Sequence, residues 1–325
     1  MAGIRDVAKL AGVGIGTVSR VLNDNGSVAE ETRKRIERAM EELDYTPNEL
    51  ARNLFQKRSG IIAVLVPDIA HPVFAELVRC IEVELFKKGF KTMVCSTVHE
   101  QNYEKEYLDM LKRHIVDGVI TGVHSLDIDE YLNTDLPIVA FDRNLGPNIP
   151  VVSANHWNGG ILAAEEMIQA GVTFVVQFYT SNIINSPSHD RHVSFEQRLK
   201  EGGVEVFSCE LGWNRFEAAY FNTVVRDVFF RYPEADGVFG TDLLAMAYMK
   251  VALEEGKKVP EELKVIAYDG TMPTTINYPT LTAIVQPFNK LAEVCTRLLM
   301  KRIAGYEIHN KKVVVDVSLR KGKTT

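Results

Sequence analysis

Metal or catalytic chemistry would need polar side chains grouped at short spacing, and the chain offers one such group. The segment 189–192, HDRH, places two imidazoles three residues apart, which could supply two ligands to a metal ion. No cysteine or acidic cluster completes the set, and the Ser and Pro residues around it are typical of a solvated loop. We therefore expect no metal site in this segment.

Phosphate binding and acyl transfer have an equally weak basis in the sequence. The glycines at 12, 14 and 16 resemble a phosphate-binding loop, but their spacing is G-x-G-x-G and no strand-like segment precedes them. The chain contains no G-x-S-x-G elbow and no Walker sequence. We therefore expect a protein that is not an enzyme and has no cofactor; the alternative is a catalytic group that only the folded cleft assembles.

The elements that must position any such residues fall into two parts. Residues 1–58 are dense in short helix signals, whereas β-branched apolar runs alternate with amphipathic helical stretches from residue 60 onward. These runs lack the polar alternation of a half-solvated sheet, so we expect buried parallel strands at 60–67, 91–97, 118–123, 137–142, 173–179, 204–209, 237–240 and 264–268. The alternation predicts a doubly wound α/β architecture. Because the order restarts near residue 173, we expect two similar lobes, with a ligand between them beyond the carboxyl ends of the strands.

The first 43 residues contain three short amphipathic helix patterns. A helix at 5–11, a turn at Gly12 and a second helix at 15–22 form the outline of a helix-turn-helix, whose second helix can lie in the DNA major groove. A third helix at 30–43 would close a small core, and Ser27 is predicted to cap its start. The alternative is that the three helices form a protein interaction module.

The next segment, 45–54, predicts a helix of about two turns that follows Pro47 and begins at an Asn48 cap. A helix this short is marginal in water and should form only against a partner. Ala51 and Leu54 lie three residues apart on one face, small then large. That pattern suits insertion of an apolar side chain between base pairs of the DNA minor groove.

The net charge of the whole chain argues against nucleic-acid binding, but the charge differs between its two parts. The 325 residues contain 37 Lys+Arg and 43 Asp+Glu, a net charge of -6. The first 58 residues contain 10 Lys+Arg and 9 Asp+Glu, so the excess acidity belongs to the remainder. Four scattered cysteines suit a reducing compartment, and charges near the start replace the apolar stretch of a signal peptide, so we expect a cytoplasmic protein.

Ordered strings along nearly the whole chain resemble the LacI/GalR family of bacterial transcription regulators. They are IRDVAKLAGVGIGTVSRVLN (4–23), ETRKRIERAMEELDYTPNELARNL (31–54), GIIAVLVPDIAHPVFAEL (60–77), PIVAFDR (137–143), VFGTDLLAMA (238–247), VPEELKVIAYDG (259–270) and PTLTAIVQP (279–287). The AYDG string at 267–270 resembles regulators of sucrose and related oligosaccharide genes.

The resemblance implies three parts. It implies a helix-turn-helix headpiece at 1–46, a hinge helix at 47–58, and a periplasmic-binding-protein-like core at 59–325 with two doubly wound parallel-sheet lobes. Lobe 1 would comprise 59–156 and 286–316, and lobe 2 would comprise 157–285 and 317–325. The carboxyl end lacks the long heptad tail that makes the lactose repressor a tetramer, so we expect a homodimer.

The same resemblance assigns the DNA contacts. Arg20 would read guanine by a bidentate hydrogen bond, next to Ile15 and Gly16 on the base-facing side of the second helix. Leu54 would be the wedge in the minor groove. The remaining expected DNA contacts, most of them polar groups that suit phosphates, are Gly14, Thr17, Ser19, Asn23, Tyr45, Asn48 and Ala51.

It also assigns an effector site between the lobes. Asp242 would accept hydrogen bonds from effector hydroxyls and Arg191 would donate them. The other candidates are Phe74, Arg143, Asn155, Trp213 and Gln286. Each has a structural alternative: Asp242 caps a helix, Arg143 pairs at the surface, and Trp213 belongs to the core.

Two departures from the family pattern affect the second lobe. Gly171 is followed by Val172 where the family commonly has histidine, and Ser194 precedes Phe195 where the family commonly has glycine. They make the pocket, and hence the effector, differ from the common pattern.

Together these observations predict a repressor of carbohydrate-utilisation genes. Its homodimer would bind a palindromic operator, and a small sugar-like effector between the lobes would control that affinity. Two alternatives stay open: the same fold sensing a nucleobase or a protein co-effector, and a sugar-binding protein or cleft enzyme with an incidental helical head.

Overall fold

The computed structural model describes residues 2–23, 26–46, 58–97, 104–123, 134–180, 186–212 and 215–325. The chain divides into two compact units, Met1–Gly60 and Ile61–Thr325, each considered by itself below. Within these described ranges, no helix is both long and apolar enough to cross a membrane.

The described residues of the first unit form three helices. They are α1 (Ile4–Leu10), α2 (Ile15–Leu22) and α3 (Glu30–Glu42). Gly12 has a φ of +65°, a left-handed conformation that glycine adopts without steric cost, and it makes the turn between α1 and α2 possible. The helices close over a small apolar core of Val7, Ala8, Ala11, Val18, Val21, Ile36 and Ala39.

The start of α3 differs from the sequence expectation. The predicted cap at Ser27 is wrong, because α3 begins at Glu30 with Ala29 as its N-cap and has no side-chain cap hydrogen bond. Glu30 and Glu31 in the first turn instead place negative charge at the positive end of the helix dipole.

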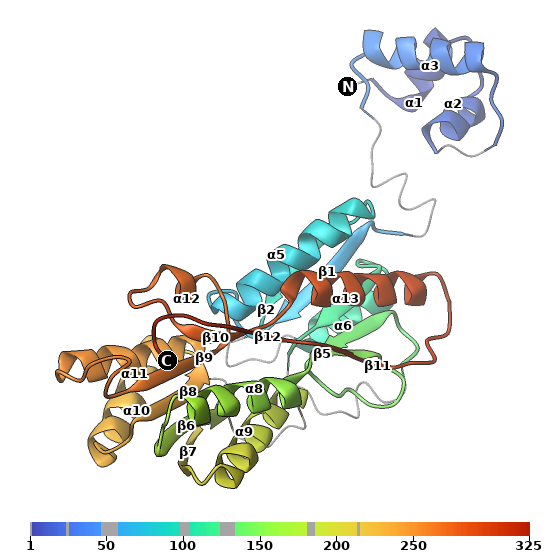
Figure 1. Cartoon of the computed structure of the whole chain (residues 1–325). Helices are drawn as coiled ribbons and strands as arrows, with labels where there is room; N and C mark the ends of the chain where they lie inside the picture. The colour runs from blue at the N-terminus through green and yellow to red at the C-terminus, as the bar shows by residue number, and fades with distance from the viewer. Residues whose placement is uncertain are drawn as a thin grey trace. The chain divides into compact units, whose positions relative to one another are not determined.

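The second unit contains two parallel sheets, each of six strands in the described ranges (Figure 1). The first sheet has the order β11-β5-β4-β3-β1-β2. Its strands are β1 (Ile61–Val66), β2 (Lys91–Ser96), β3 (Gly118–Thr121), β4 (Ile138–Phe141), β5 (Val151–Ala154) and β11 (Lys312–Val315). All of its pairings are parallel.

The second sheet has the order β12-β10-β9-β8-β6-β7. Its strands are β6 (Phe174–Thr180), β7 (Glu205–Leu211), β8 (Gly237–Thr241), β9 (Lys264–Asp269), β10 (Thr282–Val285) and β12 (Ser318–Arg320). Only the pairing of β12 with β10 is antiparallel among the pairings in the described ranges. The predicted doubly wound architecture in two lobes is therefore confirmed.

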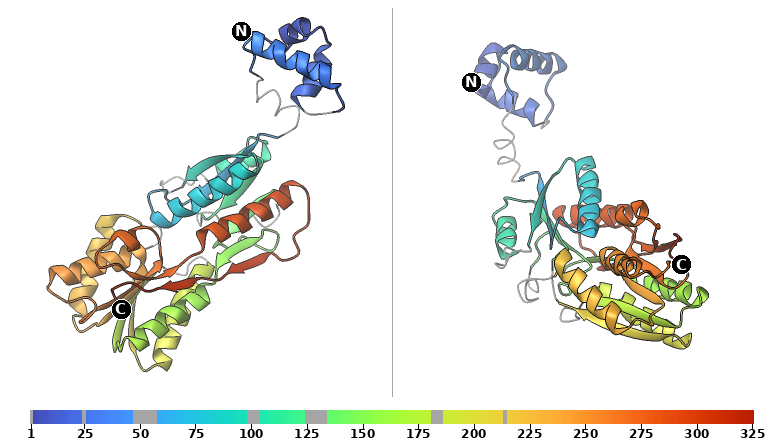
Figure 2. Two further views of the ribbon diagram at one scale, coloured as in Figure 1. Left: turned by 45° about the horizontal axis from the view of Figure 1, so that its top comes forward. Right: turned by 90° about the vertical axis from the view of Figure 1, so that its left-hand side faces the viewer.

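Alternate side chains of each strand face different helical layers. In β1, Ile62, Val64 and Val66 belong to the cluster that packs on the helices α5 and α13, whereas Ala63 and Leu65 pack toward α6. Figure 2 shows α6 on the opposite side of the first sheet from α5 and α13. These helices are α5 (Pro72–Lys87), α6 (Glu104–Lys112) and α13 (Phe288–Ile303).

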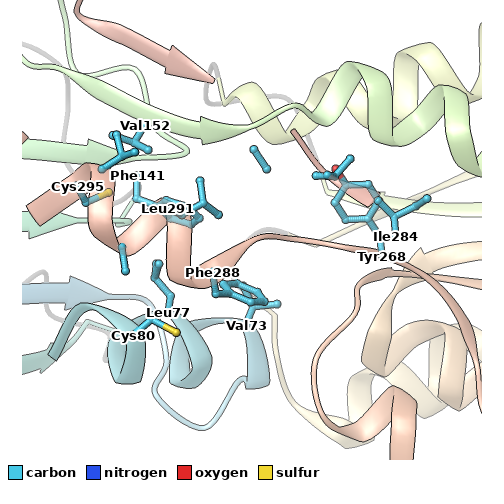
Figure 3. Close-up of a cluster of buried hydrophobic side chains, with 14 of the residues drawn as sticks. Val73, Leu77, Cys80, Phe141, Val152, Tyr268, Ile284, Phe288, Leu291 and Cys295 are labelled. Carbon is cyan, nitrogen blue, oxygen red and sulfur yellow. The ribbon is translucent and has the colours of Figure 1, made fainter. Parts of the chain in front are cut away.

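The second sheet is covered in the same way. The helices α8 (His156–Gln169) and α9 (Asp190–Glu201) pack on one face, and α10 (Ala218–Arg231) and α11 (Asp242–Glu254) pack on the other. The short helices η1 (Pro187–His189) and α12 (Pro273–Ile276) lie in connections. In the cluster drawn in Figure 3, side chains of α5 and α13 lie near Phe141 and Val152 of the first sheet. The same cluster includes Tyr268 and Ile284 of the second sheet.

The chain crosses between the two lobes three times. The crossings follow β5, β10 and β11, and they lead into α8, α13 and β12 respectively. The sequence pattern does not predict β5, β10, β11 and β12. Length alone does not explain this, because β3 and β4 also have four residues and are predicted. Three of these four strands lie directly before a crossing, and the fourth, β12, lies directly after one.

Two glycines let α8 approach its neighbours closely. A Cβ atom at Gly160 would lie 2.1 Å from Oγ of Ser194 and 2.2 Å from the carbonyl oxygen of Arg191, both in α9. A Cβ atom at Gly159 would lie 2.5 Å from the hydroxyl oxygen of Tyr268. The departure from the family pattern at Ser194 is therefore accommodated opposite a glycine, and Ser194 Oγ donates to the carbonyl of Trp157 at 2.8 Å.

We expect Gly160→Ala to destabilise the core by about 1–3 kcal/mol, because the added methyl group forces α8 and α9 apart. Urea unfolding followed by circular dichroism measures the change. Gln169→Ala, at an exposed position of the same helix, is the matched control and should stay within about 0.5 kcal/mol of the wild type. Equal stability of Gly160→Ala and wild type would contradict the close packing.

Candidate functional site

One face of α2 is free of the headpiece core. Val18 and Val21 are buried, whereas Gly14, Ile15, Gly16 and Arg20 are exposed. Ile15 keeps 45% of its surface exposed, so its side chain is available for an apolar contact. A Cβ atom at position 14 or 16 would have no neighbour within 4 Å, so neither glycine is required by packing inside the described headpiece.

The polar residues of α2 lie beside this exposed face. Thr17, Ser19 and Asn23 are half-buried, and Asn23 Nδ2 donates to the carbonyl and to Oγ of Ser19 at 2.8 and 3.2 Å. Tyr45 is half-buried and packs against the headpiece core. The structure therefore brings the predicted DNA contacts of α2 onto one side of the helix. Asn48, Ala51 and Leu54 lie outside the described residues, as does the whole predicted hinge helix.

A chain of polar contacts joins the two lobes at the carboxyl ends of their strands. His156, at the start of α8, lies 2.9 Å through Nε2 from Oδ1 of Asp142, which follows β4 of the first sheet. Its Nδ1 lies 2.9 Å from the hydroxyl of Tyr268 in β9 of the second sheet. Ser186 Oγ adds a second link by donating to the carbonyl of Asp142 at 2.7 Å.

Arg191 continues this chain inside the second lobe. Its guanidinium lies 4.4 Å from the centre of the Tyr268 ring, and its Nη1 lies 3.6 Å from Oδ1 of Asp269. Its Nε donates to Nε2 of His192 at 3.2 Å. Gln286 Nε2 donates to Oδ1 of Asp269 at 2.8 Å.

We call this set the junction cluster, and every member is at least nine-tenths buried. Its members are Asp142, His156, Arg191, Tyr268, Asp269 and Gln286.

Backbone geometry also marks the two aspartates of the junction cluster. Asp142 has a φ of +50° and Asp269 a φ of +117°, in a region that residues with a side chain rarely adopt. Such conformations cost of order 1–3 kcal/mol each and persist where the surrounding structure holds them, often at functional sites. In each lobe the strained residue ends or follows a central strand.

Asp242 is buried close to the junction cluster, but its carboxylate is already engaged. It accepts hydrogen bonds from the backbone N–H groups of Gly270 and Thr271 at 3.0 and 2.7 Å, and from Thr271 Oγ1 at 2.5 Å. These bonds hold the turn that follows β9. Asp242 is not the N-cap of α11, because that position is occupied by Thr241. The predicted effector contact at Asp242 stays a prediction.

Burial and mutual repulsion weaken the acidity of this carboxyl pair. Burial, together with the charge of Asp269, raises the pKa of Asp242 to about 7 against the opposing hydrogen bonds from Thr271 and Gly270. Burial also raises the pKa of Asp269 to about 6, against the opposing effect of Arg191 and of the Gln286 hydrogen bond.

Three other predicted effector residues either make contacts outside the junction cluster or lie outside the described residues. Arg143 is 1% exposed and pairs with Glu104 at 3.2 Å, so its partner is buried and not at the surface. It also donates to the carbonyl of Val123. Asn155 caps α8 through a bond from the backbone of Asn158 at 3.1 Å. Trp213 lies outside the described residues.

Phe74 belongs to a group of three rings at the lobe boundary. It lies 5.5 Å from His71, which precedes α5, and 6.2 Å from Phe216 of the second lobe. His71 lies 5.4 Å from Phe216. Burial, with a smaller contribution from the charge of Arg191, lowers the pKa of His71 to about 4 against the opposing effect of Asp68, so the ring is neutral at pH 7.

The sequence reading names Arg191 and Gln286 but misses the rest of the junction cluster, together with His71 and Phe216. The sequence does carry a signal for Asp142 and Asp269, because they lie at the carboxyl ends of the expected strands 137–142 and 264–268. Ligands of doubly wound folds bind beyond these strand ends. No pattern in the sequence connects His156 to Tyr268, which lies 112 positions away.

Known proteins resemble this chain over both units. Residues 3–48 match the family described as bacterial regulatory proteins, lacI family, and residues 164–325 match the periplasmic binding protein-like domain. The sucrose operon repressor of Streptococcus mutans is 37% identical over 325 residues, which cover 100% of this chain and 99% of the relative. The ribose operon repressor of Halalkalibacterium halodurans is 36% identical over 98% of this chain and 97% of the relative.

Two solved structures resemble the fold over the full length. The transcriptional regulator CelR in complex with cellobiose is 26% identical, covers 100% of both chains and has a TM-score of 0.70. The lac repressor dimer bound to operator and an anti-inducer is 24% identical, covers 100% of this chain and 99% of that chain, and has a TM-score of 0.85. At that identity the second likeness concerns the fold alone.

We expect His156→Ala to destabilise the core by about 2–3 kcal/mol, because it leaves the buried Asp142 carboxylate and Tyr268 hydroxyl without their shared partner. The free energy of unfolding in urea measures the effect. His309→Ala, at an exposed position of the same unit, should change it by less than about 0.5 kcal/mol. Equal losses in the two variants would show that the imidazole does not link the lobes.

Proposed function

This chain belongs to the LacI family of bacterial regulatory proteins, and on that basis we propose that it represses a carbohydrate-utilisation operon. The observation that carries the proposal is the likeness to the sucrose operon repressor, at 37% identity over 100% of this chain. It spans the helix-turn-helix unit and the two-lobed unit together, so the alternative of an incidental helical head has no support in the relatives. The family resemblance expected from the sequence is confirmed.

DNA binding is the task of the first unit. A homodimer places two copies of α2 in successive major grooves of a palindromic operator, where Arg20 can form two hydrogen bonds to a guanine. Ile15 supports this placement, because its exposed side chain could contact a thymine methyl group. Gly14 and Gly16 leave room for close approach of the helix to the bases. Leu54 and Ala51 of the segment 47–58 are proposed as the minor-groove contacts.

Effector sensing is the task of the second unit. We place a small sugar at the junction cluster, with Arg191, Asp269 and Gln286 as hydrogen-bonding partners and Phe74 and Trp213 as stacking partners. Hydroxyl groups suit this set, because it offers donors and acceptors from both lobes within a buried space. Asp242 acts through the turn at Gly270 and Thr271 that follows Asp269.

The two tasks are coupled by the lobes. A sugar that contacts both lobes favours one relative orientation of them, and this changes the separation of the two segments 47–58 across the dimer. Linkage requires that the operator changes sugar affinity by the same factor by which the sugar changes operator affinity. The regulator works where the bacterial chromosome is, in the cytoplasm, and the proposal needs no catalytic step.

We expect Arg20→Ala to weaken operator binding about 10- to 100-fold, in keeping with the roughly 1–3 kcal/mol of a bidentate contact to guanine. An operator selected from random duplexes by the full-length wild-type protein serves as the ligand in a gel-shift titration. Arg226→Ala removes an exposed arginine of α10 and should leave the dissociation constant unchanged. If the two variants bind equally well, α2 does not read the operator.

We expect Arg191→Ala to abolish the sugar response while the protein still binds the operator. Thermal shift with sucrose, ribose and cellobiose identifies the sugar that binds, since a ligand at 100 times its dissociation constant adds about 2.7 kcal/mol of stability. Operator affinity is then measured with and without that sugar. Arg198→Ala changes a more exposed arginine of the same helix and should keep the response. A full response in Arg191→Ala would contradict the assigned site.

A further inference from the structure

A second chain of polar contacts runs from Arg191 into the second lobe. Arg191 Nε donates to Nε2 of His192 at 3.2 Å, and Nδ1 of His192 lies 3.3 Å from Oε1 of Gln177 in β6. Gln177 Nε2 donates to Oγ of Ser208 in β7 at 2.8 Å and to Oε2 of Glu196 in α9 at 3.1 Å. We call His192, Gln177, Ser208 and Glu196 the support chain.

The positions of the four residues explain how the support chain forms. His192 and Glu196 are four residues apart in α9, so they lie on the same face of that helix. Gln177 and Ser208 are partners in the parallel register of β6 and β7, so their side chains lie on the same face of the second sheet. The four side chains therefore meet where α9 packs on that sheet.

The two ends of the support chain fix the direction of its hydrogen bonds. A guanidinium can only donate, so His192 accepts from Arg191 at Nε2 and carries its own proton on Nδ1, from which it donates to Gln177. A carboxylate can only accept, so the Gln177 amide and Ser208 Oγ both donate to Glu196, the latter at 2.9 Å. Burial, followed by the charge of Arg191, lowers the pKa of His192 well below its usual range, so the ring is neutral, as this arrangement requires.

Packing alone does not account for the polar residues of the support chain. Gln177 is 1% exposed and His192 is 5% exposed, and Gln177 stands in β6 between the buried apolar residues Val176 and Phe178. Buried amide and imidazole groups are costly unless their hydrogen bonds are made, and two apolar side chains of similar shape can replace such a pair at little cost. What two apolar side chains cannot provide is an acceptor for Nε of Arg191.

The guanidinium of Arg191 is thereby held at three places. His192 accepts from Nε, Asp269 lies 3.6 Å from Nη1, and the centre of the Tyr268 ring lies 4.4 Å from Cζ. The single N–H of Nε is engaged, so a ligand can use only the N–H groups of the two Nη atoms. Ordering a long arginine side chain costs conformational entropy, and here the side chain is ordered before any ligand binds.

We propose that His192, held by Gln177, is a positioning residue of the sugar site: it accepts the Nε–H of Arg191 and so orients the guanidinium for hydrogen bonds to sugar hydroxyls. His192 acts through Arg191 and needs no contact with the sugar. This inference rests on the proposed function, since it explains how one side of the proposed site is prepared for its ligand.

Calorimetric titration of the full-length protein with sucrose, ribose and cellobiose provides the test. His192→Leu removes the acceptor, and the sugar that binds the wild type should bind this variant at least about tenfold more weakly, because Arg191 loses a hydrogen bond that holds it. His192→Gln offers an amide oxygen as the acceptor in place of Nε2, so it should recover most of the lost affinity. Equal binding by wild type and His192→Leu, or equal losses in the two variants, overturns the inference.

A variant elsewhere in the second lobe separates positioning from general destabilisation. Val225 is buried in α10, which packs on the opposite face of the second sheet from α9. Val225→Ala should lower the free energy of unfolding but leave the sugar affinity within about twofold of the wild type. A loss of affinity as large as that in His192→Leu would show that stability governs binding, and it would overturn the inference.

The outcomes also distinguish the inference from the proposed function. If Arg191→Ala loses the sugar and His192→Leu keeps it, the assigned site stands and the inference alone fails. If none of the three sugars binds the wild type or changes its operator affinity, the proposed function fails and the inference with it.

A measurement on the wild type covers the case in which His192→Leu does not fold. Nitrogen-15 NMR of protein with labelled histidine reports which imidazole nitrogen carries the proton, and the spectrum of His192→Gln identifies the signal that belongs to His192. At neutral pH and without sugar, that proton should lie on Nδ1. A proton on Nε2 would leave Nε of Arg191 facing a donor, and it would overturn the inference.

Discussion

The imidazole of His156 is the contact on which the arrangement of the two lobes depends. It is the first residue of α8, the helix that follows the first crossing between the sheets, and it touches a side chain from each lobe. Asp142 reaches it from the end of β4 and Tyr268 from β9. The imidazole presents one ring nitrogen to each of them, so it satisfies a buried carboxylate and a buried hydroxyl at once.

This contact requires α8 to lie unusually close to its neighbours. Gly159 and Gly160 supply the space, because a methyl group at either position would overlap Tyr268 or α9. The same approach brings Arg191, at the start of α9, over the Tyr268 ring and beside Asp269. The close packing of α8 therefore depends on the glycine pair. The same packing brings the imidazole and the arginine together and so forms the polar site between the lobes.

The site combines high burial with little net positive charge. Positive φ values at Asp142 and Asp269 show that the backbone holds both carboxylates in sparsely populated conformations. In its charge the site differs from α2, whose exposed Arg20 faces a polyanion in the proposed complex.

Much of the molecule follows from local sequence pattern. Helices with one apolar face and buried strands leave periodic signals, and the ordered strings from residue 4 to residue 287 predict the headpiece, the two doubly wound lobes and the family. The predicted cap at Ser27 fails because a single capping pattern carries little information about where a helix begins. The strands β5, β10, β11 and β12 are absent from the prediction, and they are the strands that flank the three crossings between the lobes.

The effector site is where tertiary structure decides. Arg191 and Gln286 carry a family signal, but His156, Tyr268 and Asp269 become one site only when three crossings bring the ends of two sheets together. Asp242 shows the same limit, because the sequence marks it as an effector contact, and only the tertiary structure shows that its carboxylate also binds the turn after β9. The sequence by itself determined most of the helices and strands and their order, since those depend on neighbours along the chain. Which polar groups face one another, and how their charges cancel, depends on contacts between residues far apart in the chain, and only the tertiary structure decided it.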